Sequence, residues 1–173
     1  GTALLSPYTD TVTAKVSDND GNQVTGSAQA QVVLTDVKPS ITVTKTASPT
    51  SRPEPGGSFT FSINVTNTSV EPVTLTSLSD DVYGDIAAAG NPAITGTTCA
   101  LPRVILAGSS HACAFSVLYT GNPKSQRDVV TATASDDEGN PATASDDATI
   151  AITNVPPRIR VTKTPSPTSL PEP

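Results

Sequence analysis

The sequence predicts an all-β protein made of tandem β-sandwich domains, and three observations point to this fold class. The 173 residues include 16 prolines and 11 glycines, which interrupt the chain too often for long helices. Thr and Val, whose branched side chains suit extended backbone, are abundant, whereas Trp and Met are absent. Apolar and polar residues alternate with a period of two in several short segments, which is typical of strands with one buried face.

A long internal repeat sets the expected domain organisation. With an offset of 118 residues, residues 1–55 align with 119–173 without a gap, and 27 of the 55 positions are identical. Apolar, Gly and Pro positions recur in fixed register, which indicates duplication with a period of about 118 residues. The expected domains are residues 1–38, the C-terminal part of a preceding repeat; 39–157, a complete repeat; and 158–173, the N-terminal strand and Pro-rich turn of a following repeat.

The strands expected inside the complete repeat follow from its alternating segments. The clearest is 58–67, where Phe59, Phe61, Ile63 and Val65 share one face and polar residues share the other. Further strands are expected at residues 40–46, 72–78, 112–120, 130–134 and 148–152, with another edge between Cys99 and Leu106. A run of short strands separated by turn signals favours an immunoglobulin-like Greek-key sandwich.

The junctions between repeats are short and contain proline. They read DVKPS at residues 36–40 and NVPPR at residues 154–158. Proline fixes φ and limits the bend of the chain, whereas a Gly/Ser linker would be flexible. We therefore expect consecutive domains to form a semi-rigid rod. Because the repeated phrase stops partway through a unit, we also expect the polypeptide to continue beyond residues 1–173.

Several phrases of the sequence resemble a known family. They are TATASDDEGN, ITVTKTASPTSRPEPGGSFTFSINVTNTS, PVTLTSLSDDVYGDI, and TCALP followed by GSSHACAF. These phrases are similar to the prokaryotic extracellular immunoglobulin-like "conserved repeat domain" family of surface and filament proteins. The resemblance covers the central unit and both flanking fragments. It implies an immunoglobulin-like fold and an extracellular or cell-surface location, and it carries over no catalytic residues.

Cys99 and Cys113 are the only cysteines, and both fall in the complete repeat. An even cysteine count in a secreted type of β domain favours one intradomain disulfide. Two buried free thiols are the alternative. A metal site built on these thiols is not expected, because His111 is the only histidine that could join them.

Asn64 and Asn67 begin two consecutive Asn-X-Ser/Thr sequons, which are glycosylation acceptors. The alternation places Asn64 on the polar face of its strand and Asn67 at the strand end, so both are expected to be accessible. Residues 46–53, TASPTSRP, have the composition of O-glycosylated stalks. Unmodified surface asparagines are the alternative to covalently attached glycans.

Acidic residues gather at the expected turns, and calcium is the cofactor that such clusters would bind. Asp80, Asp81 and Asp85 are the expected ligands, because Ca²⁺ takes oxygen ligands from carboxylates. Turn formation and solubility explain the same residues without a metal, since Asp and Asn with Gly make good hairpin turns. No other cofactor is expected.

Charge and motif content argue against several function classes. The chain has 10 Lys+Arg against 16 Asp+Glu, a formal net charge of −6, and no basic stripe, which argues against nucleic-acid binding. No apolar run approaches the length of a membrane span in this segment. Ser109 and Ser110 precede His111, but adjacency in sequence does not make a catalytic triad, so the chain is not expected to be an enzyme.

Two functions from different classes are consistent with these features. The first is structural: a repeat unit of an extracellular rod or filament such as a stalk, fibril or surface array, whose partners are neighbouring repeats or protomers. The second is recognition, as a cell-surface adhesin or carbohydrate-binding module. Only three Tyr and no Trp are present, which weighs against the second function because ligand sites of this kind use aromatic platforms.

Overall fold

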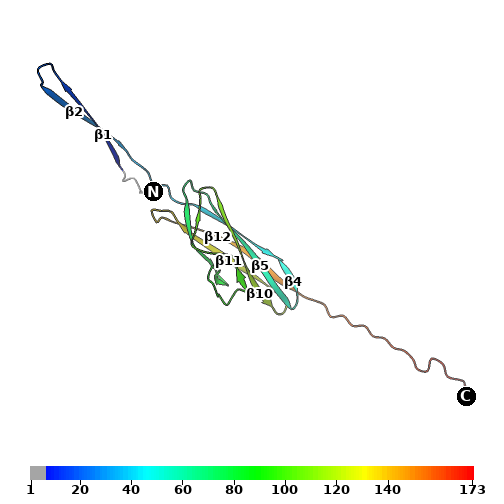
Figure 1. The fold of residues 1–173 in the computed structure, drawn as a ribbon. Coiled ribbons are helices and arrows are strands. Elements are labelled where there is room, and N and C mark those ends of the chain that lie inside the picture. Colours follow the sequence, from blue (N-terminus) through cyan, green and yellow to red (C-terminus); the bar gives the residue numbers. More distant parts are fainter. Residues whose placement is uncertain (1–6) are drawn as a thin grey trace. The chain divides into compact units, whose positions relative to one another are not determined.

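In the part of the chain that the structure describes, all regular elements are strands (Figure 1). The structure is a computed structural model that describes residues 7–173. The chain divides into two units, Gly1–Lys38 and Pro39–Pro173. Residues 1–6 of the expected first segment lie outside the described residues. In residues 7–173 no helix is long and apolar enough to cross a membrane.

The first unit is a two-stranded antiparallel hairpin of β1 (Tyr8–Ser17) and β2 (Gln23–Val32). Its turn is built around the Asp18 carboxylate, which accepts hydrogen bonds from the backbone N–H groups of Asp20 at 2.9 Å and Asn22 at 2.8 Å. Gly21 adopts φ of +85°, a conformation that side chains with Cβ disfavour. The acidic SDNDGN phrase therefore forms a hairpin turn, as turn chemistry alone predicts.

The second unit contains two sheets. One has the order β3–β5–β10–β8, and the other has the order β4–β12–β11–β6–β7 with β9 also paired to β6. The bounds are β3 Ile41–Ser48, β4 Ser51–Pro53, β5 Gly56–Asn67, β6 Val73–Asp80, β7 Gly84–Asp85, β8 Gly96–Thr97, β9 Arg103–Ile105, β10 Ser110–Thr120, β11 Lys124–Ser135 and β12 Pro141–Thr153.

The first segment of the second unit contributes to both sheets. Its β3 part pairs antiparallel with β5, and after Pro49 its β4 part pairs parallel with β12 in the other sheet. This division of the first strand, together with the two strand orders, is an immunoglobulin-like arrangement. The expectation of an all-β, immunoglobulin-like sandwich is confirmed for this unit.

The core lies between the inward faces of the two sheets. On β5, Phe59, Phe61, Ile63 and Val65 are buried, as their alternation with polar residues predicted. Phe61 stacks on Phe115 of β10 with ring centroids 5.0 Å apart. The opposite sheet contributes small and branched side chains from β11 and β12, which fit against these rings. The strands expected from alternation are all present.

Gly56 occupies the corner where the chain turns from β4 into β5. It has φ of +91°, and a Cβ atom there would lie 2.4 Å from the Tyr119 carbonyl oxygen. Any side chain would therefore collide with the backbone of β10. This close approach explains the glycine that follows Pro55 in the PEPGG phrase.

Candidate functional site: a buried lysine between two aspartates

Lys45 of β3 points into the core of the sandwich. The strand alternates with a period of two, so Lys45 shares the inward face with Ile41 and Val43. Only 4% of the residue is exposed. A buried ammonium without partners would cost many kcal/mol, so the groups around Nζ determine what this residue does.

Two aspartates from the opposite sheet reach the Lys45 amine. Nζ donates to Oδ2 of Asp80, the last residue of β6, at 2.5 Å. It also donates to Oδ1 of Asp128 in β11. The side chains of all three residues have no exposed surface. One amine and two carboxyl groups are thus enclosed together between the sheets.

Hydrogen bonds with backbone N–H groups hold Asp80 and the backbone of Lys45 in place. Oδ1 of Asp80 accepts the N–H groups of Val82 and Tyr83, both at 3.0 Å, which leaves Oδ2 for Lys45. Oδ2 of Asp146, in β12, accepts the backbone N–H of Lys45 at 2.7 Å. These hydrogen bonds hold the Lys45 backbone and the Asp80 carboxylate in fixed positions.

Burial raises the pKa of the Asp128 carboxyl group, and the nearby Asp80 charge raises it further, whereas Lys45 opposes both effects. These effects together shift the Asp128 carboxyl group toward its neutral acid form. With that proton present, the cluster contains one ammonium, one carboxylate and one neutral carboxylic acid, and carries no net charge. A neutral cluster costs less to bury than three ionised groups with an excess negative charge.

Aromatic rings separate the cluster from water. Lys45 Nζ lies 4.7 Å from the Phe61 ring centroid and 5.6 Å from that of Phe115. The Tyr83 ring packs against Phe115, with ring centroids 5.7 Å apart. The Tyr83 hydroxyl accepts a hydrogen bond from Gln126 Nε2 at 2.6 Å. Burial raises the pKa of Tyr83 to about 12, and the charges of Asp128 and Asp80 add to this effect.

Lys45 and Asp128 were not among the site residues expected from the sequence. A signal was present: the period of two places Lys45 on the face of Ile41 and Val43, and Asp128 on the face of Val130. A lysine and an aspartate on apolar faces of two strands are expected to pair if the strands lie in facing sheets. Which strands face each other is not visible in local alternation.

The structure does not bring together the three candidate calcium ligands, Asp80, Asp81 and Asp85. Asp80 points into the core and its two oxygens are already occupied by Lys45 and the backbone. Asp81 lies on the exposed side, where its Oδ1 accepts the Val129 N–H, and Asp85 accepts the Ala87 N–H. In residues 7–173 these three carboxylates are not among the groups whose oxygens come within 4.8 Å of one another.

The two sequon asparagines have different environments. Asn67 is fully buried, and its Nδ2 donates to the carbonyl oxygens of Glu71 and Ile105 while its Oδ1 accepts from Ser69. Its expected accessibility is therefore wrong in the folded domain, because the amide ties a loop to β9. Asn64 is half-buried on the outer face of β5, and its glycosylation stays a prediction.

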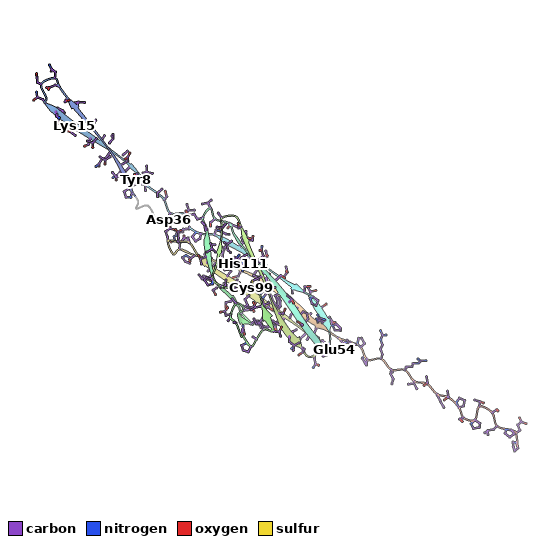
Figure 2. The ribbon with its side chains drawn as sticks, in the orientation of Figure 1. Tyr8, Lys15, Asp36, Glu54, Cys99 and His111 are labelled. Carbon is purple, nitrogen blue, oxygen red and sulfur yellow. A yellow bond between two sulfur atoms is a disulfide. The ribbon has the colours of Figure 1, made fainter. Side chains whose placement is uncertain are left out.

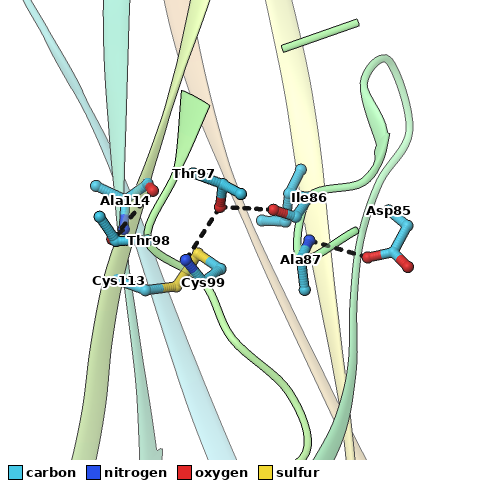
Figure 3. Close-up of a disulfide and its surroundings, with 8 residues drawn as sticks. All are labelled: Asp85, Ile86, Ala87, Thr97, Thr98, Cys99, Cys113 and Ala114. Carbon is cyan, nitrogen blue, oxygen red and sulfur yellow. Dashed lines mark hydrogen bonds between the residues drawn. A yellow bond between two sulfur atoms is a disulfide. The ribbon is translucent and has the colours of Figure 1, made fainter. Parts of the chain in front are cut away.

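Cys99 and Cys113 form the expected disulfide (Figure 3). The bond joins the segment between β8 and β9 to β10, and both residues are buried. The Thr97 hydroxyl donates to the Ile86 carbonyl and accepts the Cys99 N–H, which holds the cysteine in position. A buried disulfide is compatible with an extracellular protein. The free-thiol alternative is wrong, since neither cysteine is free.

The fold and the disulfide define the class of this protein as a disulfide-bonded, immunoglobulin-like β-sandwich. No protein-family model and no curated protein matches the sequence. Among solved structures, the chain is similar to the ASH/PapD-like domain 7 of human CEP192, with 12% identity and a TM-score of 0.39. That similarity covers 66% of this chain and 87% of the other.

Proposed function

We propose that this chain is a stretch of an extracellular rod or filament assembled from tandem β-sandwich domains. The observation that carries the proposal is the relation between the hairpin of the first unit and the last two strands of the complete sandwich. The proposal extends to the domain boundaries inferred from the repeat, with residues 1–38 and 158–173 belonging to flanking domains.

The two hairpins have the same register when their numbering is offset by 118. Tyr8 pairs with Val32 in the first unit, and Gln126 pairs with Ile150 in the second. Their turns also correspond, because Asp136 accepts the backbone N–H of Asn140 at 2.7 Å as Asp18 does from Asn22. The β1–β2 hairpin therefore has the backbone pairing of the β11–β12 hairpin.

The first hairpin exposes the face that its counterpart buries. Val12 is 65% exposed, whereas the corresponding Val130 has no exposed surface. The same contrast holds for three further pairs: Val16 and Ala134, Val24 and Ala142, and Val32 and Ile150. Figure 2 shows the side chains of this hairpin, with Tyr8 and Lys15 labelled on β1. A row of exposed valines on a sheet face indicates a surface that another sheet covers.

The C-terminal segment supports the same arrangement. Residues 159–161 repeat the start of β3, and Ile159 and Val161 are exposed where Ile41 and Val43 are buried. Its sequence repeats the segment that divides between the two sheets of the sandwich. A following domain would bury these two side chains as the present one buries their counterparts.

Recognition of a carbohydrate is the second candidate function. A shallow depression of about 360 Å³ lies on the outer face of β3, β5 and β10, lined by Thr44, Thr46, Ser62, Asn64 and Thr98 among others. Its hydroxyl and amide groups suit a polar ligand. It contains no aromatic side chain, and Tyr83 is buried in the core, so the stacking surface that sugar sites favour is missing from this depression.

Electron microscopy of the native protein purified from its source tests the filament proposal. We expect rods or fibres with a repeating globular unit, and an intact mass above the 17.6 kDa of this chain. Uniformly short monomers at that mass would overturn the proposal. A glycan array tests the alternative separately, because an adhesin binds a defined sugar and a purely structural segment binds none.

A further inference from the structure

The buried cluster of Lys45, Asp80 and Asp128 holds the reactants of an amide bond. Nζ of Lys45 contacts the Asp128 carboxyl group directly, in a core without access for water. We propose that the two side chains are joined by an intramolecular isopeptide bond between Lys45 Nζ and Asp128 Cγ, formed after folding with Asp80 as the proton carrier. This proposal stands independently of the filament function.

Folding supplies the proximity that the reaction requires. Lys45 on β3 and Asp128 on β11 belong to opposite sheets, and their backbones are held by strand pairing over many residues. Holding two groups in reactive geometry gives effective concentrations of roughly 10⁵–10⁸ M in favourable cases. Amines and carboxylic acids do not condense at useful rates in water, but this pair has no competing water inside the core.

The protons of the cluster allow the reaction to balance without a cofactor. Lys45 passes one ammonium proton to the Asp80 carboxylate and becomes a neutral amine. Its lone pair attacks Cγ of Asp128 in the neutral acid form, toward which burial shifts this carboxyl group by raising its pKa. The N–C bond forms, the C–OH bond breaks, and Asp80 accepts a proton from nitrogen while it protonates the departing hydroxyl. One amide and one water result from the ammonium of Lys45 and the neutral acid of Asp128, and the remaining proton stays on Asp80.

Asp80 is oriented for proton transfer. Two backbone N–H groups occupy its Oδ1, so Oδ2 is directed at Nζ of Lys45 at 2.5 Å. The Phe61 and Phe115 rings next to the amine keep water away from the intermediate. The product amide is neutral, so the reaction removes the cost of keeping an ammonium and a carboxylate inside the core.

The sequence repeat provides a second, independent observation. At an offset of 118 residues, Asp10 corresponds to Asp128, and Lys163 corresponds to Lys45. Asp146 is not repeated, because Ala28 occupies its position. Each reacting residue thus recurs once, the aspartate in the first fragment and the lysine in the last, as expected if each domain forms the same bond. Lys163 is exposed and Asp10 is exposed, so within this chain only one bond is expected.

Intact-mass spectrometry of the purified 173-residue chain, after reduction of the disulfide, tests the proposal. The expected mass is lower than that calculated from the sequence by one water, about 18 Da. Trypsin should then fail to cleave after Lys45, and the peptide Asp128–Arg158 should stay attached to the fragment that contains Lys45. A full calculated mass with normal cleavage after Lys45 would overturn the proposal.

Four variants separate the bond from a simple ion pair. Lys45→Met and Asp80→Asn should keep the full mass calculated from their sequences. Lys45→Met lacks the nucleophile, and Asp80→Asn lacks the proton carrier. Asp128→Asn should condense with loss of ammonia and give the same final mass as the cross-linked wild type. Asp81→Asn, a matched change at the neighbouring exposed position, should still lose water. If Lys45→Met or Asp80→Asn fails to fold, the mass and digest of the wild type still decide the question.

Discussion

Lys45 and Asp128 are 83 residues apart in the sequence and meet through Nζ and Oδ1 in the core. Lys45 lies in β3, which follows the junction at Pro39, and Asp128 lies in β11, which pairs along its length with β12. Force applied through the two ends of the domain would enter at β3 and leave from β12. A covalent bond at this contact would therefore carry the load and leave the chain between the two residues slack.

Single-molecule pulling should detect this bypass. Eighty-three residues extend to about 270–300 Å, and this length should be missing from the unfolding extension of the wild type. The Lys45→Met variant should recover it under reducing conditions, where the disulfide does not shorten the chain. Equal extensions for the two proteins would show that no bond spans Lys45 and Asp128.

Removal of the disulfide should destabilise the domain. The bond closes a loop of sequence separation 14, for which the loss of unfolded-state entropy corresponds to about 3 kcal/mol. We expect the double variant Cys99→Ala/Cys113→Ala to lose about this much free energy of unfolding in urea. The oxidised and reduced wild type should differ in the same direction. A change below about 1 kcal/mol would mean that strain or residual structure offsets the loop effect.

A matched pair of valines tests the exposed face of the first hairpin. Val130→Ala removes buried methyl groups and should lower the free energy of unfolding of the sandwich by about 2 kcal/mol. Val12→Ala is the same change at the corresponding exposed position and should stay within about 0.5 kcal/mol. Denaturant titration monitored by circular dichroism measures both. A large effect of Val12→Ala would show that this face is covered in the isolated chain.

Tyr83 should make stability fall at high pH. Its pKa is raised from 10.0 to about 12 in the folded chain, so the fold favours the neutral phenol. The resulting stability is fully present below pH 10 and is lost as pH rises from about 10 through about 12. We expect the urea midpoint of the wild type to fall more steeply in this range than that of Tyr83→Phe. Parallel curves would contradict the raised pKa.

Strand positions could be predicted from the sequence because side chains alternate across a sheet. The residues of β5 that the pattern placed inside, such as Phe59 and Phe61, are buried, and those between them are not. The disulfide could be predicted because only two cysteines were available in one domain. The alternation in β3 also places Lys45 on the inward face of the strand, but it does not show which residues Lys45 contacts.

The sequence by itself determined the all-β fold, the repeat period and the inward face of the clearly alternating strands, because these depend on local alternation and on identity between segments. The tertiary structure alone decided which inward groups meet. Asp80 is 35 residues from Lys45 and Asp128 is 83, and only the stacking of two sheets places both carboxyl groups at one amine. Asp80 was expected at the surface as a metal ligand, but it lies in the core. It is buried there because the buried ammonium of Lys45 needs an opposite charge nearby.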